Sequence, residues 1–168
     1  MPSTIRLRAL EPEDLDLLYL LENESDVWSM SAHTAPYSRH SLMKFIANTT
    51  YDVHVDGYVR LIAERVDGVI VGLVDLTGYD PIDLRAELGI AILPELRNKG
   101  YGRSAIFALL HYAKKHLGLR LVSATTLDSN VLAHKLLLSC GFEHAATLPK
   151  WYLREHKHQD SHIYIKFL

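Results

Sequence analysis

The sequence has little of what marks secreted, membrane or nucleic-acid-binding proteins. Its single cysteine, Cys140, cannot form an internal disulfide, and the residues after Met1 lack the charged start and apolar core of a signal peptide. The longest apolar runs are too short to span a membrane. The formal net charge is −2, whereas a nucleic-acid surface needs a basic excess. We therefore expect a protein of the reducing cytoplasm that binds neither membrane nor nucleic acid.

Two common phosphate-binding motifs are also missing. There is no G-x-x-x-x-G-K-[ST] loop, which disfavours a P-loop nucleotide hydrolase, and no G-x-G-x-x-G after the first expected strand, which disfavours a dinucleotide fold. The composition, with 48% hydrophobic and 23% charged residues, is that of a folded globular protein. At 168 residues, the chain fits one domain, residues 1–168.

The most informative stretch of the sequence runs from Glu87 to Ala105. Residues 88–93 form an apolar run that predicts a strand buried on both faces, and Pro94 ends it. A basic, glycine-containing loop follows and leads into an amphipathic helix over residues 102–117. Glycines let the backbone approach a ligand, and a helix N-terminus attracts anions. This order of elements predicts a phosphate site.

Two blocks of the sequence resemble the GNAT superfamily of N-acetyltransferases. The loop resembles the family's acetyl-CoA pyrophosphate motif, [QR]-x-x-G-x-[GA], in the residues Arg97-Asn98-Lys99-Gly100-Tyr101-Gly102. A later block resembles the family's asparagine-initiated helix that ends in Gly-Phe, in the residues Asp128-Ser129-Asn130, Ala133 and Ser139-Cys140-Gly141-Phe142. The resemblance spans most of the chain and is greatest to the branch of spermidine/diamine and ribosomal-protein alanine acetyltransferases.

This resemblance implies a fold, a cosubstrate and a reaction. The fold would be α/β, a mixed and mostly antiparallel sheet of about seven strands with about four helices. The reaction would move the acetyl group of acetyl-CoA to a primary amine, in a small amine or polyamine or at a protein N-terminus, by direct attack in a ternary complex. The cofactor-binding residues it implies are Ile90, Ala91 and Ile92 (backbone to the pantetheine arm), Arg97, Asn98, Lys99, Gly100, Tyr101, Gly102, Arg103 and Ser104 (pyrophosphate), and Asn130 (pantetheine arm, or simply a helix cap).

The attacking amine must be neutral, so a base has to accept its proton. The resemblance implies Glu87 for this role, at the start of the central strand. Partial burial would raise the pKa of Glu87 toward neutrality. Alternatively, Glu87 pairs with Arg85 or another cation, or lies exposed in solvent.

One departure from the family concerns the general acid. Many relatives have a tyrosine five residues before the Gly-Phe phenylalanine, which protonates the CoA thiolate, and this sequence has Leu137 there. Leucine cannot donate a proton. His134 lies one helical turn earlier, and we interpret it as a helix-surface residue. Leu137 therefore leaves a second hypothesis open, a catalytically silent acetyl-CoA-binding regulatory or interaction domain.

The acceptor site is less well defined. Trp28 and Tyr37 are candidates to line it, although both are equally good core anchors beneath a loop. Polyamine acetyltransferases of the resembled branch carry two glutamates before a Pro-Tyr step, whereas here Thr34 and Ala35 precede Pro36-Tyr37. Surface acids such as Glu22 could still attract a cationic amine, but we favour an ordinary solvated role for them.

The rest of the chain predicts the order of elements. A strand at Ile5 precedes a helix from Pro12, and Asp67-Gly68 joins two strands, residues 58–65 and 69–77, into a hairpin. Gly72 predicts a bulge or a close backbone contact. The strands expected later cover residues 119–126, 142–148 and 163–167, with a polar loop over residues 149–162. We expect no metal site from the histidines of that loop, and a homodimer could form through this C-terminal hairpin.

Overall fold

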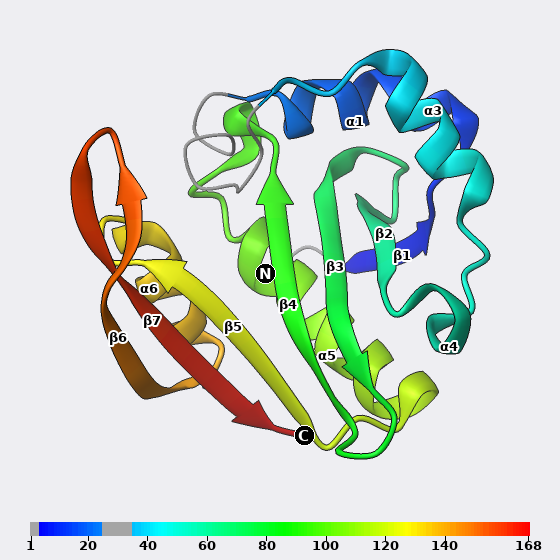
Figure 1. Ribbon diagram of the computed structural model, residues 1–168. Coiled ribbons are helices and arrows are strands. Elements are labelled where there is room, and N and C mark those ends of the chain that lie inside the picture. The colour runs from blue at the N-terminus through cyan, green and yellow to red at the C-terminus, as the bar shows by residue number, and fades with distance from the viewer. Residues whose placement is uncertain (1–3, 25–34) are drawn as a thin grey trace.

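A computed structural model describes residues 4–24 and 35–168 and contains a seven-stranded sheet of order β1-β2-β3-β4-β5-β7-β6 (Figure 1). The strands are β1 (Ile5–Ala9), β2 (Val59–Arg65), β3 (Ile70–Asp80), β4 (Arg85–Ile92), β5 (Leu121–Leu127), β6 (Glu143–Arg154) and β7 (Lys157–Phe167). The sheet is mixed and mostly antiparallel, which confirms the expected fold class. In the described part of the chain, no helix is long and apolar enough to cross a membrane.

The helices lie on both faces of this sheet. They are α1 (Leu15–Glu22), α3 (Arg39–Asn48), α4 (Val53–Asp56), α5 (Tyr101–Leu117) and α6 (Val131–Ser139), with short 3-10 helices at Pro12–Asp14 and Pro94–Leu96. One core cluster packs α5 and α6 against one face, and a second packs α1 and α3 against the other. About four helices were expected and the described residues form five, because the four-residue α4 is too short to show a hydrophobic period.

Helix α5 makes the crossover that the sequence predicts. Ile106 and Leu109 of its apolar stripe are fully buried, and left-handed Gly100 and Gly118 flank its two ends. The helix carries the chain from β4 to β5, which pair in parallel as expected. Figure 1 shows α5 behind the strands of this region. The β4–β5 ladder is short and joins only Arg85–Glu87 to Leu121–Ser123.

Gly72 on β3 makes the close contact expected from its place inside a strand. A Cβ atom on Gly72 would lie 2.1 Å from the Ala91 carbonyl oxygen of β4. The register of β3 with β2 shifts beside it, between Ala63 and Glu64. Both the bulge and the close backbone approach are therefore present, and they fix how β4 lies against β3.

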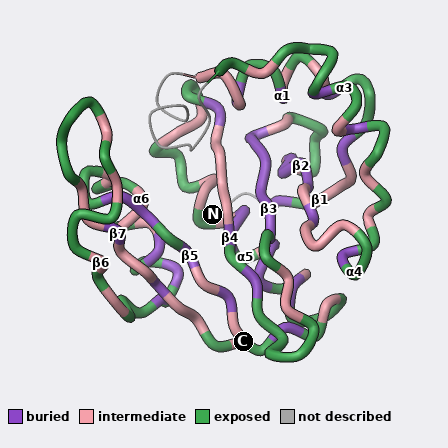
Figure 2. Tube along the Cα trace, viewed as in Figure 1, coloured by how far each residue is buried: buried purple, intermediate pink, exposed green. Residues whose placement is uncertain are grey.

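The C-terminal hairpin differs from the prediction. Residues 149–162 were expected to form a loop, but they belong to two long strands joined at Glu155 and His156. Both turn residues have positive φ, 48° and 63°, so they form a tight hairpin turn without the glycine or asparagine that usually marks one. Pro149, which cannot donate to a ladder, lies in a register shift of β6. Figure 2 shows that the tip of this hairpin is exposed, whereas residues 71–76 of β3 are buried.

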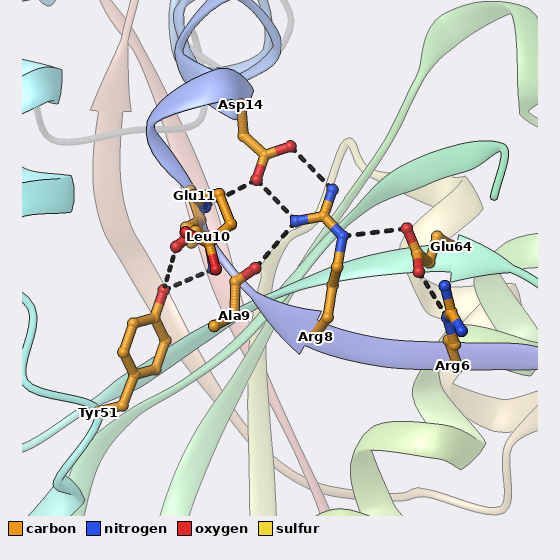
Figure 3. Close-up of polar contacts among 8 residues, drawn as sticks. All are labelled: Arg6, Arg8, Ala9, Leu10, Glu11, Asp14, Tyr51 and Glu64. Atoms are coloured by element: carbon orange, nitrogen blue, oxygen red, sulfur yellow. Dashed lines mark hydrogen bonds and ion pairs between the residues drawn. The ribbon is translucent and has the colours of Figure 1, made fainter.

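A polar network ties β1 to the start of α1 (Figure 3). Arg8 donates to both carboxylate oxygens of buried Asp14, with Nη1–Oδ2 at 2.7 Å and Nη2–Oδ1 at 2.9 Å, and to Glu64 Oε2 from Nε at 3.0 Å. Arg6 holds the other oxygen of Glu64. Asp14 also accepts from the Glu11 amide in a capping box. The network fixes the start of α1 relative to β1. Helix α1 also contributes to the wall of the site described next.

Candidate active site

The basic loop joins the end of β4 to the N-terminus of α5, as the sequence predicts. Asn98 and Gly100 both have positive φ, 60° and 84°, and the loop turns directly into the helix at Tyr101. The first backbone amides of α5 have no partners within the helix and lie at its positive end. Lys99 and Arg103 are exposed beside them. This is a phosphate-binding geometry built largely from main chain, which suits the pyrophosphate of CoA.

The side chain of Arg97 turns away from this loop. Its Nε donates to the Ile92 carbonyl at 3.0 Å, and its Nη2 pairs with Glu24 Oε2 at 2.7 Å. The guanidinium thus ties the end of β4 to the segment that follows α1. Tyr101 also faces back toward the sheet, where its hydroxyl accepts from Arg65 at 3.5 Å.

Helix α6 lies against the loop helix where the second sequence block begins. Asn130 caps α6, since its Oδ1 accepts from the Ala133 amide at 3.1 Å. Gly102 of α5 packs beside Leu136 of α6, and a Cβ on Gly102 would lie 3.3 Å from a Leu136 methyl carbon. The two blocks that carry the resemblance are therefore in contact.

The basic loop follows the end of β4 that, among the described residues, pairs with β3 on one side but not with β5 on the other. Residues 90–92 of β4 pair with β3 on one side, Ile90 with Val74 and Ile92 with Gly72. On the other side, the described ladder between β4 and β5 ends at Glu87 and Ser123. The backbone edge of β4 beyond Glu87 is thus open to an extended ligand that pairs as a strand.

Glu87 lies on the sheet face covered by α1 and α3. Its partner on β3 is Thr77, and their side chains share a face with Asp75, two residues away. Glu87 is exposed, so the expectation of partial burial is wrong. The neighbouring cation is engaged elsewhere, because Arg85 pairs with Asp80 and Asp83.

A pocket of about 300 Å³ opens on this same face and reaches Thr77, the cross-strand partner of Glu87. Its lining combines aromatic, charged, hydroxyl and aliphatic side chains from α1, α3, β2, β3 and the segments just before α3 and β2: Glu22, Tyr37, Ser41, Leu42, Phe45, Tyr58, Arg60, Asp75 and Thr77. Tyr37, expected either to line the acceptor site or to anchor the core, lines this pocket and also packs against the core cluster of α1 and α3. Burial, followed by the charge of Glu22, raises the pKa of its phenol. Trp28, the other predicted aromatic, lies outside the described residues.

An ion-pair triad forms the polar wall of the pocket. Arg60 of β2 donates from Nε and Nη2 to Asp75 Oδ2, at 3.1 and 2.8 Å, and from Nη1 to Glu22 of α1. Burial alone would lower the pKa of Arg60, but the charges of Asp75 and Glu22 outweigh it and raise that pKa. Two carboxylates and one guanidinium leave one net negative charge.

Sequence reasoning missed this triad. Asp75 stands alone inside the apolar run of β3, between Val74 and Leu76, and Arg60 interrupts the apolar run of β2. Single opposite charges in two neighbouring strands were the available signal. Only the register, which pairs Arg60 with Asp75, reveals that they meet. Glu22 was interpreted as a solvated surface acid and is instead half-buried in the pocket.

The position of the expected tyrosine is apolar core. Leu137 is buried in the cluster under α5 and α6. His134, interpreted as a surface residue, is instead held on both sides, with Nε2 at 3.1 Å from the Leu127 carbonyl and Nδ1 at 2.7 Å from the Tyr164 hydroxyl. Because a carbonyl only accepts, Nε2 carries a proton, and in the neutral imidazole the buried Tyr164 hydroxyl donates to Nδ1. This pair ties α6 to β7.

Comparison with known proteins agrees with this geometry. The model of the acetyltransferase (GNAT) domain matches residues 4–143. The chain is 29% identical over 160 residues to a spermidine N(1)-acetyltransferase of Vibrio cholerae, covering 95% of this chain and 91% of the relative. A spermidine N(1)-acetyltransferase of Escherichia coli K12 is 32% identical over 118 residues, covering 67% of this chain and 59% of that protein.

A solved structure extends the comparison to the whole fold. The spermidine N-acetyltransferase of Vibrio cholerae in complex with CoA and spermine superposes with a TM-score of 0.87 and 27% identity, over 98% of this chain and 95% of that one. The chain belongs to the GNAT acetyltransferase family. It is an enzyme that moves the acetyl group of acetyl-CoA to a primary amine, which confirms the predicted reaction and cosubstrate.

Proposed function

We propose that this chain acetylates a small cationic amine of the polyamine class, such as spermidine. The pocket beside Glu87 carries this proposal, because it combines one net negative charge with the aromatic rings of Tyr37, Phe45 and Tyr58. An alkylammonium chain is attracted by a carboxylate at its charged nitrogen and by aromatic faces. The named spermidine acetyltransferases among the relatives support the same class. In this chain the negative charge of the pocket comes from Glu22 and Asp75. They would take the role of the two glutamates that polyamine acetyltransferases of the resembled branch carry before the Pro-Tyr step, which this sequence lacks.

In this proposal the chain holds acetyl-CoA, which supplies the acyl thioester, mainly through backbone groups. Residues 90–92 of β4 would pair with the pantetheine arm, and residues 97–104 would hold the pyrophosphate, with Lys99 and Arg103 adding charge. Arg97 contributes main chain only, since its guanidinium is held by Glu24. Asn130 would contact the arm from the cap of α6.

The exposed carboxylate of Glu87 determines how the acceptor amine loses its proton. Glu87 is exposed next to the pocket, so it would take the amine's proton through water as the amine attacks directly in the ternary complex. Leu137 offers no proton to the departing thiolate, and water at the open side of the pocket would supply it. Loss of the tyrosine then affects how the thiolate is protonated and does not remove the reaction.

The test is CoA thiol release from acetyl-CoA against spermidine, spermine, putrescine and a short peptide with a free N-terminus. We expect turnover with the polyamines, and a fall in kcat of at least about 10-fold for Glu87→Gln with little change in the KM for acetyl-CoA. The matched control is Glu143→Gln, an exposed acid on β6. CoA release with the peptide and with none of the polyamines would show that the acceptor is a protein N-terminus and not a polyamine. Tight acetyl-CoA binding without release from any amine would favour the silent domain.

Two expectations from the sequence stay predictions. One is that residues 1–168 act as a single domain in the cytoplasm. The other is a homodimer through the β6–β7 hairpin, on which Trp151 and Leu153 are exposed. Light scattering on the purified chain would give the oligomeric state.

A further inference from the structure

Among the described residues, Asp75 uses only one of its two carboxylate oxygens. Oδ2 accepts both hydrogen bonds from Arg60. Within residues 4–24 and 35–168, Oδ1 has no hydrogen-bond partner, although Asp75 is only 8% exposed. Oδ1 is not fully buried, since Ser161 Oγ is the one fully buried polar side-chain atom without a partner among the described residues. Oδ1 is therefore an acceptor that solvent or a ligand in the adjoining pocket can reach.

The direction of Oδ1 is set by Gly89. Asp75 and Gly89 are cross-strand partners on β3 and β4, and a Cβ on Gly89 would lie 2.1 Å from Asp75 Oδ1. The carboxylate therefore lies over the main chain of β4, in space that any other residue at position 89 would fill. Ile90, the next residue, begins the stretch proposed to carry the pantetheine arm. Oδ1 thus faces the strand where the thioester is expected, and it belongs to a side chain that lines the pocket.

Arg60 keeps the carboxylate in this orientation. Its two bonds to Oδ2 fix the rotamer of Asp75, and its third bond, to Glu22, fixes the guanidinium in turn. The side chain also lies over the Phe45 ring, with Cζ 5.5 Å from the centroid. Arg60 is held from three sides, and Oδ1 is the acceptor that this arrangement leaves for a substrate.

We infer that Asp75 binds the amino group of the acceptor through Oδ1, with Arg60 as its positioning residue. The inference rests on the proposed function and adds the atom that orients the amine. An N–H donated to Oδ1 places the nitrogen near Gly89 on β4, between residues 90–92, where the thioester is expected, and Glu87, which lies two residues before Gly89 on the same face. Arg60 also neutralises one of the two acids, so the pocket matches one ammonium group at a time.

The test uses five variants: Asp75→Asn, Gly89→Ala, Asp75→Ala, the double variant Asp75→Ala/Gly89→Ala, and Arg60→Lys. Spermidine binding is measured by calorimetry on CoA-saturated protein, and rates by CoA release. We expect Asp75→Asn to weaken spermidine binding by about 10- to 100-fold, as for loss of a charge-assisted hydrogen bond, with the KM for acetyl-CoA unchanged. Gly89→Ala should act in the same direction, because its methyl group displaces Oδ1.

The double variant separates substrate binding from structure. If Gly89→Ala acts by displacing Oδ1, it has no further effect once Asp75 is alanine. Arg60→Lys keeps the positive charge but loses the planar guanidinium that donates to Asp75 and Glu22 together. We expect it to raise the KM for spermidine more than it lowers kcat. An undiminished Gly89→Ala effect in the Asp75→Ala background would overturn the inference, as would Asp75→Asn binding spermidine as wild type does. Binding of spermidine without turnover refutes the proposed function alone, so the two failures are distinguishable.

Discussion

Replacement of Arg8 by methionine tests how much the network at the start of α1 stabilises the fold. Arg8→Met keeps a similar length and leaves Asp14, 5% exposed, without its bidentate partner, while Glu64 retains Arg6. Removing one member of a buried pair costs roughly 3–5 kcal/mol, and the partial exposure of Arg8 lowers this, so we expect a loss of about 2–3 kcal/mol. With a urea m value of about 2 kcal/mol per molar, the unfolding midpoint falls by about 1–1.5 M.

The pH dependence of this loss is a second readout of the same variant. Burial alone would raise the pKa of Asp14, but hydrogen bonds from Arg8 and the Glu11 amide lower it below its ordinary value. A carboxyl with a lowered folded-state pKa stabilises the fold above its unfolded pKa of about 4, and this contribution is lost as pH falls through the folded value. The gap between wild type and Arg8→Met should therefore shrink below about pH 4.

Urea unfolding followed by circular dichroism at pH 7 and at pH 3 measures both effects. The matched control is Arg39→Met, which removes an exposed ion pair with Asp16 and should leave the midpoint unchanged. The reasoning is refuted if Arg8→Met shifts the midpoint at pH 7 no more than Arg39→Met does. It is also refuted if the gap between wild type and Arg8→Met is as wide at pH 3 as at pH 7.

Two further predictions concern the cofactor loop and the cysteine. Gly102→Val should weaken acetyl-CoA binding by at least about 10-fold in calorimetry, because a Cβ there already lies 3.3 Å from Leu136 and a branched side chain would part α5 from α6; wild-type affinity would contradict the loop assignment. Burial raises the pKa of the Cys140 thiol, so the native protein should react with Ellman's reagent at pH 8 far more slowly than the urea-unfolded chain; equal rates would show that the site is accessible.

Local patterns were enough to predict the centre of this fold. The Asp67-Gly68 turn, the period of the helix after Gly100 and the parallel crossover all follow from rules that act over a few residues. A C-terminal hairpin was expected, but the extension of β6 and β7 through residues 149–162 was missed for the same reason. Its turn at Glu155 and His156 adopts left-handed backbone without the residues that favour it, and only pairing between two long strands makes that conformation worth its cost.

The residues of the candidate site likewise fall into those that a local motif predicts and those that only the fold brings together. The glycine loop is a contiguous motif, so its residues could be named from the sequence. The triad of Glu22, Arg60 and Asp75 joins three elements, and its members meet only because the register sets Arg60 opposite Asp75 and because α1 ends above them. His134 was misjudged since its partners, Leu127 and Tyr164, lie on two other elements. Long-range register and helix placement, rather than residue type, decided these cases.

The short parallel seam between β4 and β5 has a consequence for the thermodynamics of the whole molecule. It divides the sheet into two antiparallel halves, β1 to β4 and β5 to β7, that share a ladder only at Arg85–Glu87 and Leu121–Ser123 in the described chain. A cosubstrate that pairs along the open edge of β4 would bridge the halves and raise the free energy of unfolding by mass action. Cellular acetyl-CoA would then act as a folding ligand, and the abundance of the protein would follow the supply of its own cosubstrate.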